Sequence, residues 1–217
     1  LWQLLARQYG TNNLPDCSNM CHESSGVALN ESIGIGKGTV RLEDFDKADL
    51  IVVVGQNPGT NHPRMLSALK SAKKSGASVL SINPLKETGM RRFRHPQSPI
   101  DMLGAGTQIS DDHVDIKVNG DMALFRAIGS IILDKGVHDM DFINLNTTGF
   151  LDYANIARAV DWGLTEDLTG QSRDRIYEIS DYFCRSKRTI VCWAMGITQH
   201  KNSVNTIREI MNVLLLK

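Results

Sequence analysis

The chain has 217 residues, and its 24 lysine and arginine residues balance 24 aspartate and glutamate residues, giving a formal net charge of +0 at pH 7. This balance excludes a strong net positive charge that would attract nucleic acid or an anionic membrane. Any anion must therefore be bound by backbone and side-chain groups at one local site. The four cysteines are too few for a dense disulfide framework, and no apolar run reaches the roughly 18 residues of a membrane span. We expect a cytoplasmic protein whose core is large enough to fold without disulfides.

The first fifty residues predict short helices that are separated by turns. A helix over 1–9 is followed by a polar loop over 11–20, and a second helix over 27–33 ends at the glycines of 34–38. Thr39 is then the expected N-cap of another short helix.

Cys21 and His22 lie at the turn between this loop and the second helix. The N-terminus of a helix stabilises a thiolate through the helix dipole and the free N–H groups, which makes Cys21 a candidate metal ligand or nucleophile. The alternative is that Cys21 is a small buried apolar residue and His22 a hydrogen-bonded turn residue, because most free cysteines are buried and unreactive. Spacing alone favours this alternative.

The segment 50–55 is a continuous apolar and β-branched run, typical of a parallel strand that is buried on both faces. A loop over 56–63, a helix over 64–75 and a strand over 78–82 complete a βαβ unit. Ligands of such units bind at the carboxyl ends of the strands, so we expect the loop to lie beside residues 83–87.

The segment 89–112 has no clear periodicity and predicts a long loop, of the kind that serves a site or an interface. Its basic run over 91–96 has two interpretations, a phosphate contact or a solvated surface. We favour the solvated surface.

An alternating strand over 114–118 is expected next. Asp121 is the expected N-cap of a helix over 122–134, and Gly120 permits a close backbone approach. We therefore expect this strand end to form a third wall of the same crevice.

Helical patterns predominate between residues 137 and 186. We expect helices over 139–145, 149–161 and 173–186, the last of them with Ser172 as its N-cap. A buried strand over 189–194 follows, and a final helix begins after Asn202.

Strands that alternate with helices predict an α/β fold, a doubly wound, mostly parallel, Rossmann-like sheet flanked by helices, with a helical layer in the second half. We treat 1–217 as one region. Its first part, 1–136, holds the Cys-His turn and a first nucleotide-binding half, and its second part, 137–217, holds the helical segment, the returning strand and the last helix. Because the chain starts and stops within helical patterns, we interpret it as a piece of a longer protein. The absence of a GxGxxG after strand 50–55, and of a P-loop anywhere, disfavours ordinary dinucleotide binding and P-loop chemistry.

Short motifs occur along the chain in a fixed order. They are Gly10-Thr11-Asn12-Asn13, Cys21-His22, Val54-Gly55-Gln56-Asn57-Pro58-Gly59-Thr60-Asn61-His62-Pro63, Ile82-Asn83-Pro84, Asn119-Gly120-Asp121-Met122-Ala123-Leu124 and Trp193-Ala194-Met195-Gly196-Ile197-Thr198-Gln199. Together they resemble the landmarks of the molybdopterin oxidoreductases of the dimethyl-sulfoxide-reductase superfamily, and most closely those of the formate dehydrogenase alpha subunit.

This resemblance implies a bis(molybdopterin guanine dinucleotide) cofactor with molybdenum or tungsten, in which Cys21 is the metal ligand and His22 orients the substrate or handles a proton. A soft thiolate suits such a metal centre. By the same resemblance, the cofactor-binding residues are Gly55, Gln56, Asn57, Pro58, Gly59, Thr60, Asn61, Asn83, Pro84, Gly120, Asp121, Met195, Gly196, Thr198 and Gln199. The resemblance also implies electron-transfer subunits, an iron–sulfur cluster upstream of this segment and an active-site arginine downstream of it.

The sequence departs from this family pattern after the Cys-His pair. Residues 23–27 are Glu-Ser-Ser-Gly-Val, where formate dehydrogenases usually continue Gly-Pro-Ser-Val, so the substrate stays open between formate and a related small molecule. Two other hypotheses remain. One is a nucleotide-binding module without redox chemistry in which Cys21 is structural, and the other is an interface domain that uses the basic loop 91–95. The polar strand ends favour the enzyme.

Overall fold

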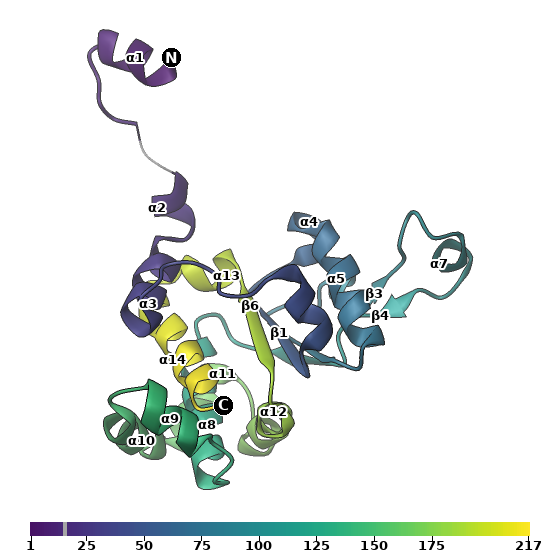
Figure 1. Ribbon diagram of the computed structural model, residues 1–217, viewed down its shortest axis with the longest axis vertical. Coiled ribbons are helices and arrows are strands. Elements are labelled where there is room, and N and C mark those ends of the chain that lie inside the picture. Colours follow the sequence, from purple (N-terminus) through teal and green to yellow (C-terminus); the bar gives the residue numbers. More distant parts are fainter. Residues whose placement is uncertain (15–16) are drawn as a thin grey trace.

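The computed structural model describes residues 1–14 and 17–217, and Figure 1 shows a central sheet with helices around it. Four parallel strands form this sheet in the order β5-β2-β1-β6. Their bounds are β1 Leu50–Val54, β2 Ser78–Asn83, β5 Asp112–Asp115 and β6 Thr189–Trp193. The strands predicted over 50–55, 78–82 and 189–194 are thus confirmed, and every residue of β1 is buried. The expected burial of the last strand is wrong, because β6 lies at the edge of the sheet and only Ile190 is buried.

Helices cover both faces of the sheet, which confirms the doubly wound α/β fold. Leu50, Val52 and Val54 of β1 belong to one apolar core, and Ile51 and Val53 belong to another. The first core is completed by α3 (Glu23–Ile33), α8 (Asp121–Asp134), α12 (Arg173–Arg185) and α14 (Ser203–Leu215). The second is completed by α5 (Pro63–Lys74), the 3-10 helix η1 (Leu42–Lys47) and α6 (Thr88–Arg91). Alternate side chains of a strand point to opposite faces, so two cores require a continuous apolar run.

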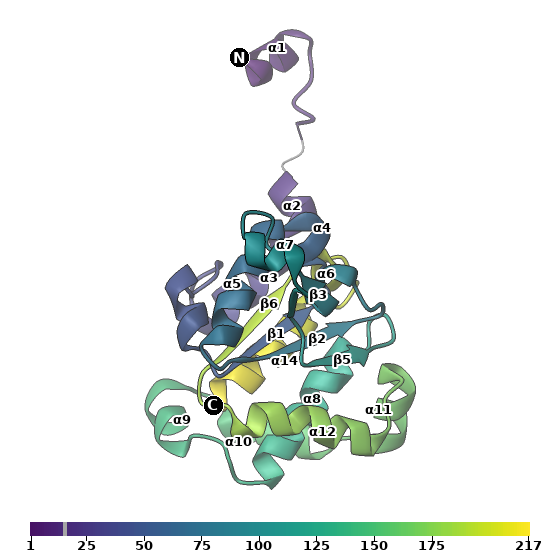
Figure 2. The ribbon, with the colours of Figure 1, turned by 90° about the vertical axis from the view of Figure 1, so that its right-hand side faces the viewer.

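The second half adds the predicted helical layer, formed by α9 (Met140–Asn146), α10 (Phe150–Arg158) and α11 (Trp162–Thr169). In Figure 2 these helices lie along the side of the molecule farthest from α1 (Trp2–Gln8), and α10 and α11 contact α8. The expectation of one helix over 149–161 is wrong at its end, and α11 was not expected. The Asp161 side chain accepts a hydrogen bond from the Leu164 N–H at 3.0 Å and caps a new helix there.

Three other predicted boundaries are corrected by local hydrogen bonds. The strand expected over 114–118 begins two residues earlier and ends at Asp115, because the chain then turns and the Lys117 N–H donates to the Thr169 carbonyl at 3.0 Å. Asp121 is the first residue of α8 rather than its N-cap, which is Gly120. The N-cap of η1 is Arg41 instead of Thr39, because the Arg41 N–H donates to the Asp44 carboxylate at 2.8 Å.

The segment 89–112 is not a plain loop. It contains α6, α7 (Pro99–Leu103) and a small antiparallel sheet of β3 (Arg92–Phe93) and β4 (Thr107–Gln108). Met90 and Ile109 anchor it in the second core, which is the physical reason for its order. Arg91, Arg92 and Arg94 are exposed, in agreement with the solvated-surface interpretation.

The region before the sheet also differs from expectation. Part of the predicted loop 11–20 is the helix α2 (Cys17–Cys21), while residues 15 and 16 of that loop lie outside the described part of the chain. The helix expected over 27–33 begins earlier, at Glu23. Two further short helices, α4 (Pro58–Asn61) and α13 (Met195–Thr198), occupy the ends of β1 and β6. Within the described residues, no helix has both the length and the apolar character that a membrane crossing requires.

Candidate functional site

The candidate site lies at the carboxyl edge of the sheet, where the strand order reverses. In the sheet, β2 lies on one side of β1 and β5 lies beyond β2. The last strand, β6, pairs with the opposite side of β1. The gap between the ends of β1 and β6 is therefore the topological switch point, the place where open α/β sheets bind their ligands.

Two glycines meet at this switch point. The Gly196 N–H donates to the Gly55 carbonyl at 3.1 Å, and Gly55 has a φ of 56°. A Cβ atom on Gly196 would lie 2.5 Å from the Gly55 carbonyl oxygen, and one on Gly55 would lie 2.8 Å from the Gly196 carbonyl carbon. Both positions therefore require glycine.

The loops after β1 and β2 lie together, as predicted. The Asn83 side chain donates to the Gln56 carbonyl at 2.9 Å, and the Asn57 side chain donates to Glu87 at 2.7 Å. Asn57 also caps α4 by accepting from the Thr60 N–H at 3.3 Å. Glu87 was not singled out from the sequence, because no periodicity links it to Asn57.

Two more glycines allow α4 and α6 to pack. A Cβ atom on Gly59 would lie 2.8 Å from the Gly89 Cα atom. Pro58 is buried beside them, whereas Thr60, Asn61 and Pro84 are exposed. The close packing of Gly59 on Gly89 therefore fixes the backbone of this loop, while Thr60 and Asn61 remain exposed to solvent.

The Cys-His turn is bound to the segment that follows β6. The Cys21 Sγ atom lies 3.7 Å from the Met195 Sδ atom, and the Gln199 side chain donates to the Met20 carbonyl. The Ser24 hydroxyl donates to the Thr198 carbonyl at 3.2 Å. Residues about 170 positions apart in the sequence therefore form one site.

Cys21 is the last residue of α2, and His22 is the N-cap of α3. The predicted position beside a helix N-terminus is thus correct, although the thiol lies one residue outside the cap. Cys21 is half-buried and His22 is exposed, so Cys21 is not the fully buried residue of the alternative interpretation.

Ser25 fixes the orientation of the His22 ring. Its hydroxyl accepts from the Trp193 indole N–H at 2.9 Å and lies 3.3 Å from His22 Nδ1. Because the indole is only a donor, the serine proton is free to be donated to Nδ1. Neutral His22 then carries its proton on Nε2. Ser25 and Trp193 were missed from the sequence, although Ser25 lies one helical turn after His22.

Gly120 and Asp121 occupy the end of β5, at the far side of β2 from the switch point. A Cβ atom on Gly120 would lie 2.6 Å from the Leu168 carbonyl oxygen, so the backbone that approaches Gly120 is that of α11. Asp121 is 4% exposed, and burial raises the pKa of its carboxyl group to about 6. This strand end lies along the same edge of the sheet, and β2 and β1 lie between β5 and β6.

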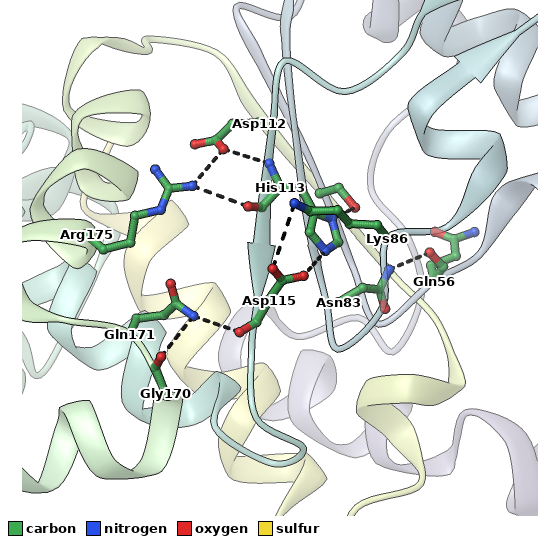
Figure 3. A network of polar contacts seen from close by, with 10 residues as sticks. Gln56, Asn83, Lys86, Asp112, His113, Asp115, Gly170, Gln171 and Arg175 are labelled. Atoms are coloured by element: carbon green, nitrogen blue, oxygen red, sulfur yellow. Dashed lines mark hydrogen bonds and ion pairs between the residues drawn. The ribbon is translucent and has the colours of Figure 1, made fainter.

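A second polar cluster, shown in Figure 3, joins β5 to its neighbours. His113 Nε2 lies 2.8 Å from the Asp115 carboxylate, which also lies 3.9 Å from Lys86 Nζ. Arg175 of α12 pairs with Asp112 at 2.7 Å. Burial lowers the pKa of His113, although Asp115 acts in the opposite direction. The two-residue spacing of His113 and Asp115 places both on one face of a strand, a signal that the sequence offered.

Two buried polar atoms at the candidate site have no hydrogen-bond partner among the described residues. They are Gln56 Oε1 and Thr198 Oγ1, which follow β1 and β6 respectively. Leaving such an atom unpaired costs free energy, so these two atoms are suited to a ligand.

Comparison with known proteins gives consistent results. A family model described as "Molybdopterin oxidoreductase" matches residues 1–217. An uncharacterized oxidoreductase of Mycobacterium tuberculosis is 49% identical over 100% of this chain and 28% of its own length. Formate dehydrogenase H of Escherichia coli is 28% identical over 95% of this chain and 27% of its own. The solved structure of acetylene hydratase from Pelobacter acetylenicus matches the fold with a TM-score of 0.75 and 18% identity, over 100% of this chain and 27% of that one. The chain thus spans less than a third of the length of these relatives.

The Gly55–Gly196 contact leads to a prediction about stability. We expect Gly196→Ala to lower the free energy of unfolding by about 1–3 kcal/mol, because the methyl group would overlap the Gly55 backbone. Urea denaturation would measure this change. Gly163→Ala is the matched control, since its Cβ atom meets only Asp161 at 3.6 Å and should leave stability unchanged or slightly higher. Equal free energies of unfolding for the two variants would contradict the inference that the Gly55–Gly196 contact has no room for a methyl group.

The buried Asp121 leads to a prediction about pH. Its raised pKa means that the folded state holds a proton between about pH 4 and 6 that the unfolded state releases, so stability falls as pH rises through this window. We expect Asp121→Asn to raise the free energy of unfolding at pH 7.5 by about 2 kcal/mol and to flatten that pH dependence. Asp134→Asn, at the exposed end of the same helix, is the control. A less stable Asp121→Asn variant at pH 7.5 would mean that the carboxylate has a favourable partner.

Proposed function

This chain belongs to the molybdopterin oxidoreductase family, and from that membership we propose that it forms the part of a molybdenum or tungsten oxidoreductase that supplies the metal ligand and one cofactor-binding edge. The observation that carries the proposal is the contact of the Cys21 thiol with the Met195 loop at the switch point of the sheet. The family implies a pterin cofactor with one of these two metals. We further propose the bis(molybdopterin guanine dinucleotide) form, and formate or a related small molecule as the substrate, with formate dehydrogenase H among the relatives in support.

The residues at the switch point fit a large anionic cofactor. The Gly55 and Gly196 backbones are free of side chains, and the unpaired Gln56 Oε1 and Thr198 Oγ1 atoms could accept hydrogen bonds from it. Asn57, Asn61 and the other residues of the loops after β1, β2 and β6 would hold its nucleotide part. Gly120 and Asp121 would contact it only farther along the sheet edge.

When bound, the metal and its pterin supply the acceptor for two electrons from the substrate. Cys21 would hold the metal through its thiolate, and the Gln199 bond to the Met20 carbonyl positions the turn that carries it. The thiol proton that points to the Met195 sulfur would leave when the thiolate binds the metal. His22 would orient the substrate through Nε2–H, because Ser25 occupies Nδ1. The serine oxygen can also accept from a protonated Nδ1, so His22 could hold a proton during turnover.

We propose a reducing cellular setting for this protein. Cys17, Cys21, Cys184 and Cys192 are all free thiols, which supports a reducing, cytoplasmic location. Electron-transfer subunits would be separate partner chains, and an iron–sulfur cluster would lie in the full-length protein outside residues 1–217. A small-molecule substrate follows from the family.

Metal analysis of the full-length protein tests this proposal. We expect molybdenum or tungsten in the wild type, and a Cys21→Ala variant that loses more than about a hundredfold in dye-linked oxidation of its substrate, since even supporting residues of a metal site are worth 10–100-fold. Formate is the first substrate to assay.

Cys17→Ala is the matched control, because Cys17 lies at the other end of α2 and is exposed. It should stay within about twofold of wild type. If the wild type contains neither metal, or if Cys21→Ala and Cys21→Ser keep full function, a nucleotide-binding module with a structural Cys21 becomes the better interpretation.

A further inference from the structure

A cleft of about 310 Å³ lies beside the Cys-His turn. His22 and Ser25 line it from α3, Val191 and Trp193 line it from β6, and Lys37 lines it from the loop after α3. Its remaining lining residues are Leu29, Gly36, Gly38 and Cys192. None of the nine is an acid, so the cleft has a lysine, a histidine and no opposing carboxylate in its lining.

The position of Lys37 follows from a close backbone contact. A Cβ atom on Gly36 would lie 3.0 Å from the Gly26 carbonyl oxygen, so the Gly36 backbone packs directly on α3. Gly26 is in turn bonded through its N–H to the His22 carbonyl at 3.0 Å. This packing places Lys37 with His22 in the lining of the cleft.

Lys37 makes no ion pair or hydrogen bond within the part of the chain that the structure describes. Other lysines do, as Lys73 does with Asp111 and Lys135 with Asp181. An ammonium group without a counterion, at a cleft whose lining holds no acid, favours an anionic ligand.

The remaining walls of the cleft suit a small anion. Burial raises the pKa of Cys192 to about 12, so its thiol is neutral near pH 7 and does not repel negative charge. Leu29 and Val191 are apolar and add no negative charge to the lining, while Lys37 itself is exposed to solvent. His22 adds a further donor in the tautomer that carries its proton on Nε2, in which Ser25 donates to Nδ1.

We propose that this cleft binds a small, singly charged anion, such as a carboxylate or an oxyanion, and that Lys37 is its counter-charge. The proposal that an anion binds here depends only on the residues that line the cleft. That the bound anion is the substrate or product of the enzyme rests on the proposed function, because it depends on the metal being held at the neighbouring Cys21. Lys37 would then determine the charge of the molecules that reach His22.

Bromide is a suitable probe, because its anomalous scattering locates it in a crystal. Crystals of the full-length protein, soaked in a series of sodium bromide concentrations, should show bromide in the cleft beside Lys37. Lys37→Gln should weaken this binding about tenfold or more, as expected when a charged hydrogen-bond partner is removed. Lys37→Arg, which keeps the charge, should retain it, and added sodium formate should displace the bromide.

The control variant is Lys187→Gln, at the opposite end of β6, where the lysine is also exposed. It should leave bromide in the cleft unchanged. Bromide that is absent from the cleft of the wild type, or equally bound in Lys37→Gln, would overturn the proposal. Metal content separates the two proposals. Bromide bound in a wild type that contains neither molybdenum nor tungsten would support the anion site and refute the proposed enzyme.

Discussion

The contact between the Gly55 and Gly196 backbones is the constraint on which the candidate site depends. It lies where β1 and β6 end side by side, and it has room for no side chain on either residue. Because Gly196 is fixed there, α13 begins immediately after β6 and directs Met195, Thr198 and Gln199 toward the Cys-His turn. The position of Cys21 is therefore set by a residue about 170 positions away, through one close backbone approach.

Hydroxyl groups complete this arrangement at the positions where the sequence departs from the formate dehydrogenase pattern. Ser24 bonds to the Thr198 carbonyl and to Ser203, which joins α3 to α13 and to the start of α14. Ser25 joins His22 to Trp193. The same region also leaves Gln56 and Thr198 with unpaired buried atoms, an unfavourable feature for folding that is typical of functional sites. The Cys-His turn is thus held by hydrogen bonds to α13, α14 and β6, while Gln56 and Thr198 at the switch point keep polar atoms without a partner.

Much of the architecture could be predicted from the sequence because the signals were local. The apolar runs at 50–54 and 189–193 predicted parallel strands, of which the first is buried throughout and the second only at Ile190. The polar residues after each strand are the basis for the candidate binding edge. The short helices α2, α4 and α13 were missed because four or five residues give no periodicity. The partners of His22 and Asn57 were missed because such contacts are formed only by the tertiary fold. Gly120 was expected to permit a close backbone approach, and the sequence could not show that the approaching backbone is that of α11.

The central claim is that Cys21 supplies the protein ligand of the metal at the switch point of the sheet. X-ray absorption spectroscopy of the full-length protein, at the edge of whichever metal it contains, tests this claim most directly. The account predicts that Cys21→Ser replaces one sulfur neighbour of the metal by an oxygen neighbour and leaves the other sulfur neighbours in place. A sulfur shell that is identical in the wild type and the Cys21→Ser variant would contradict it.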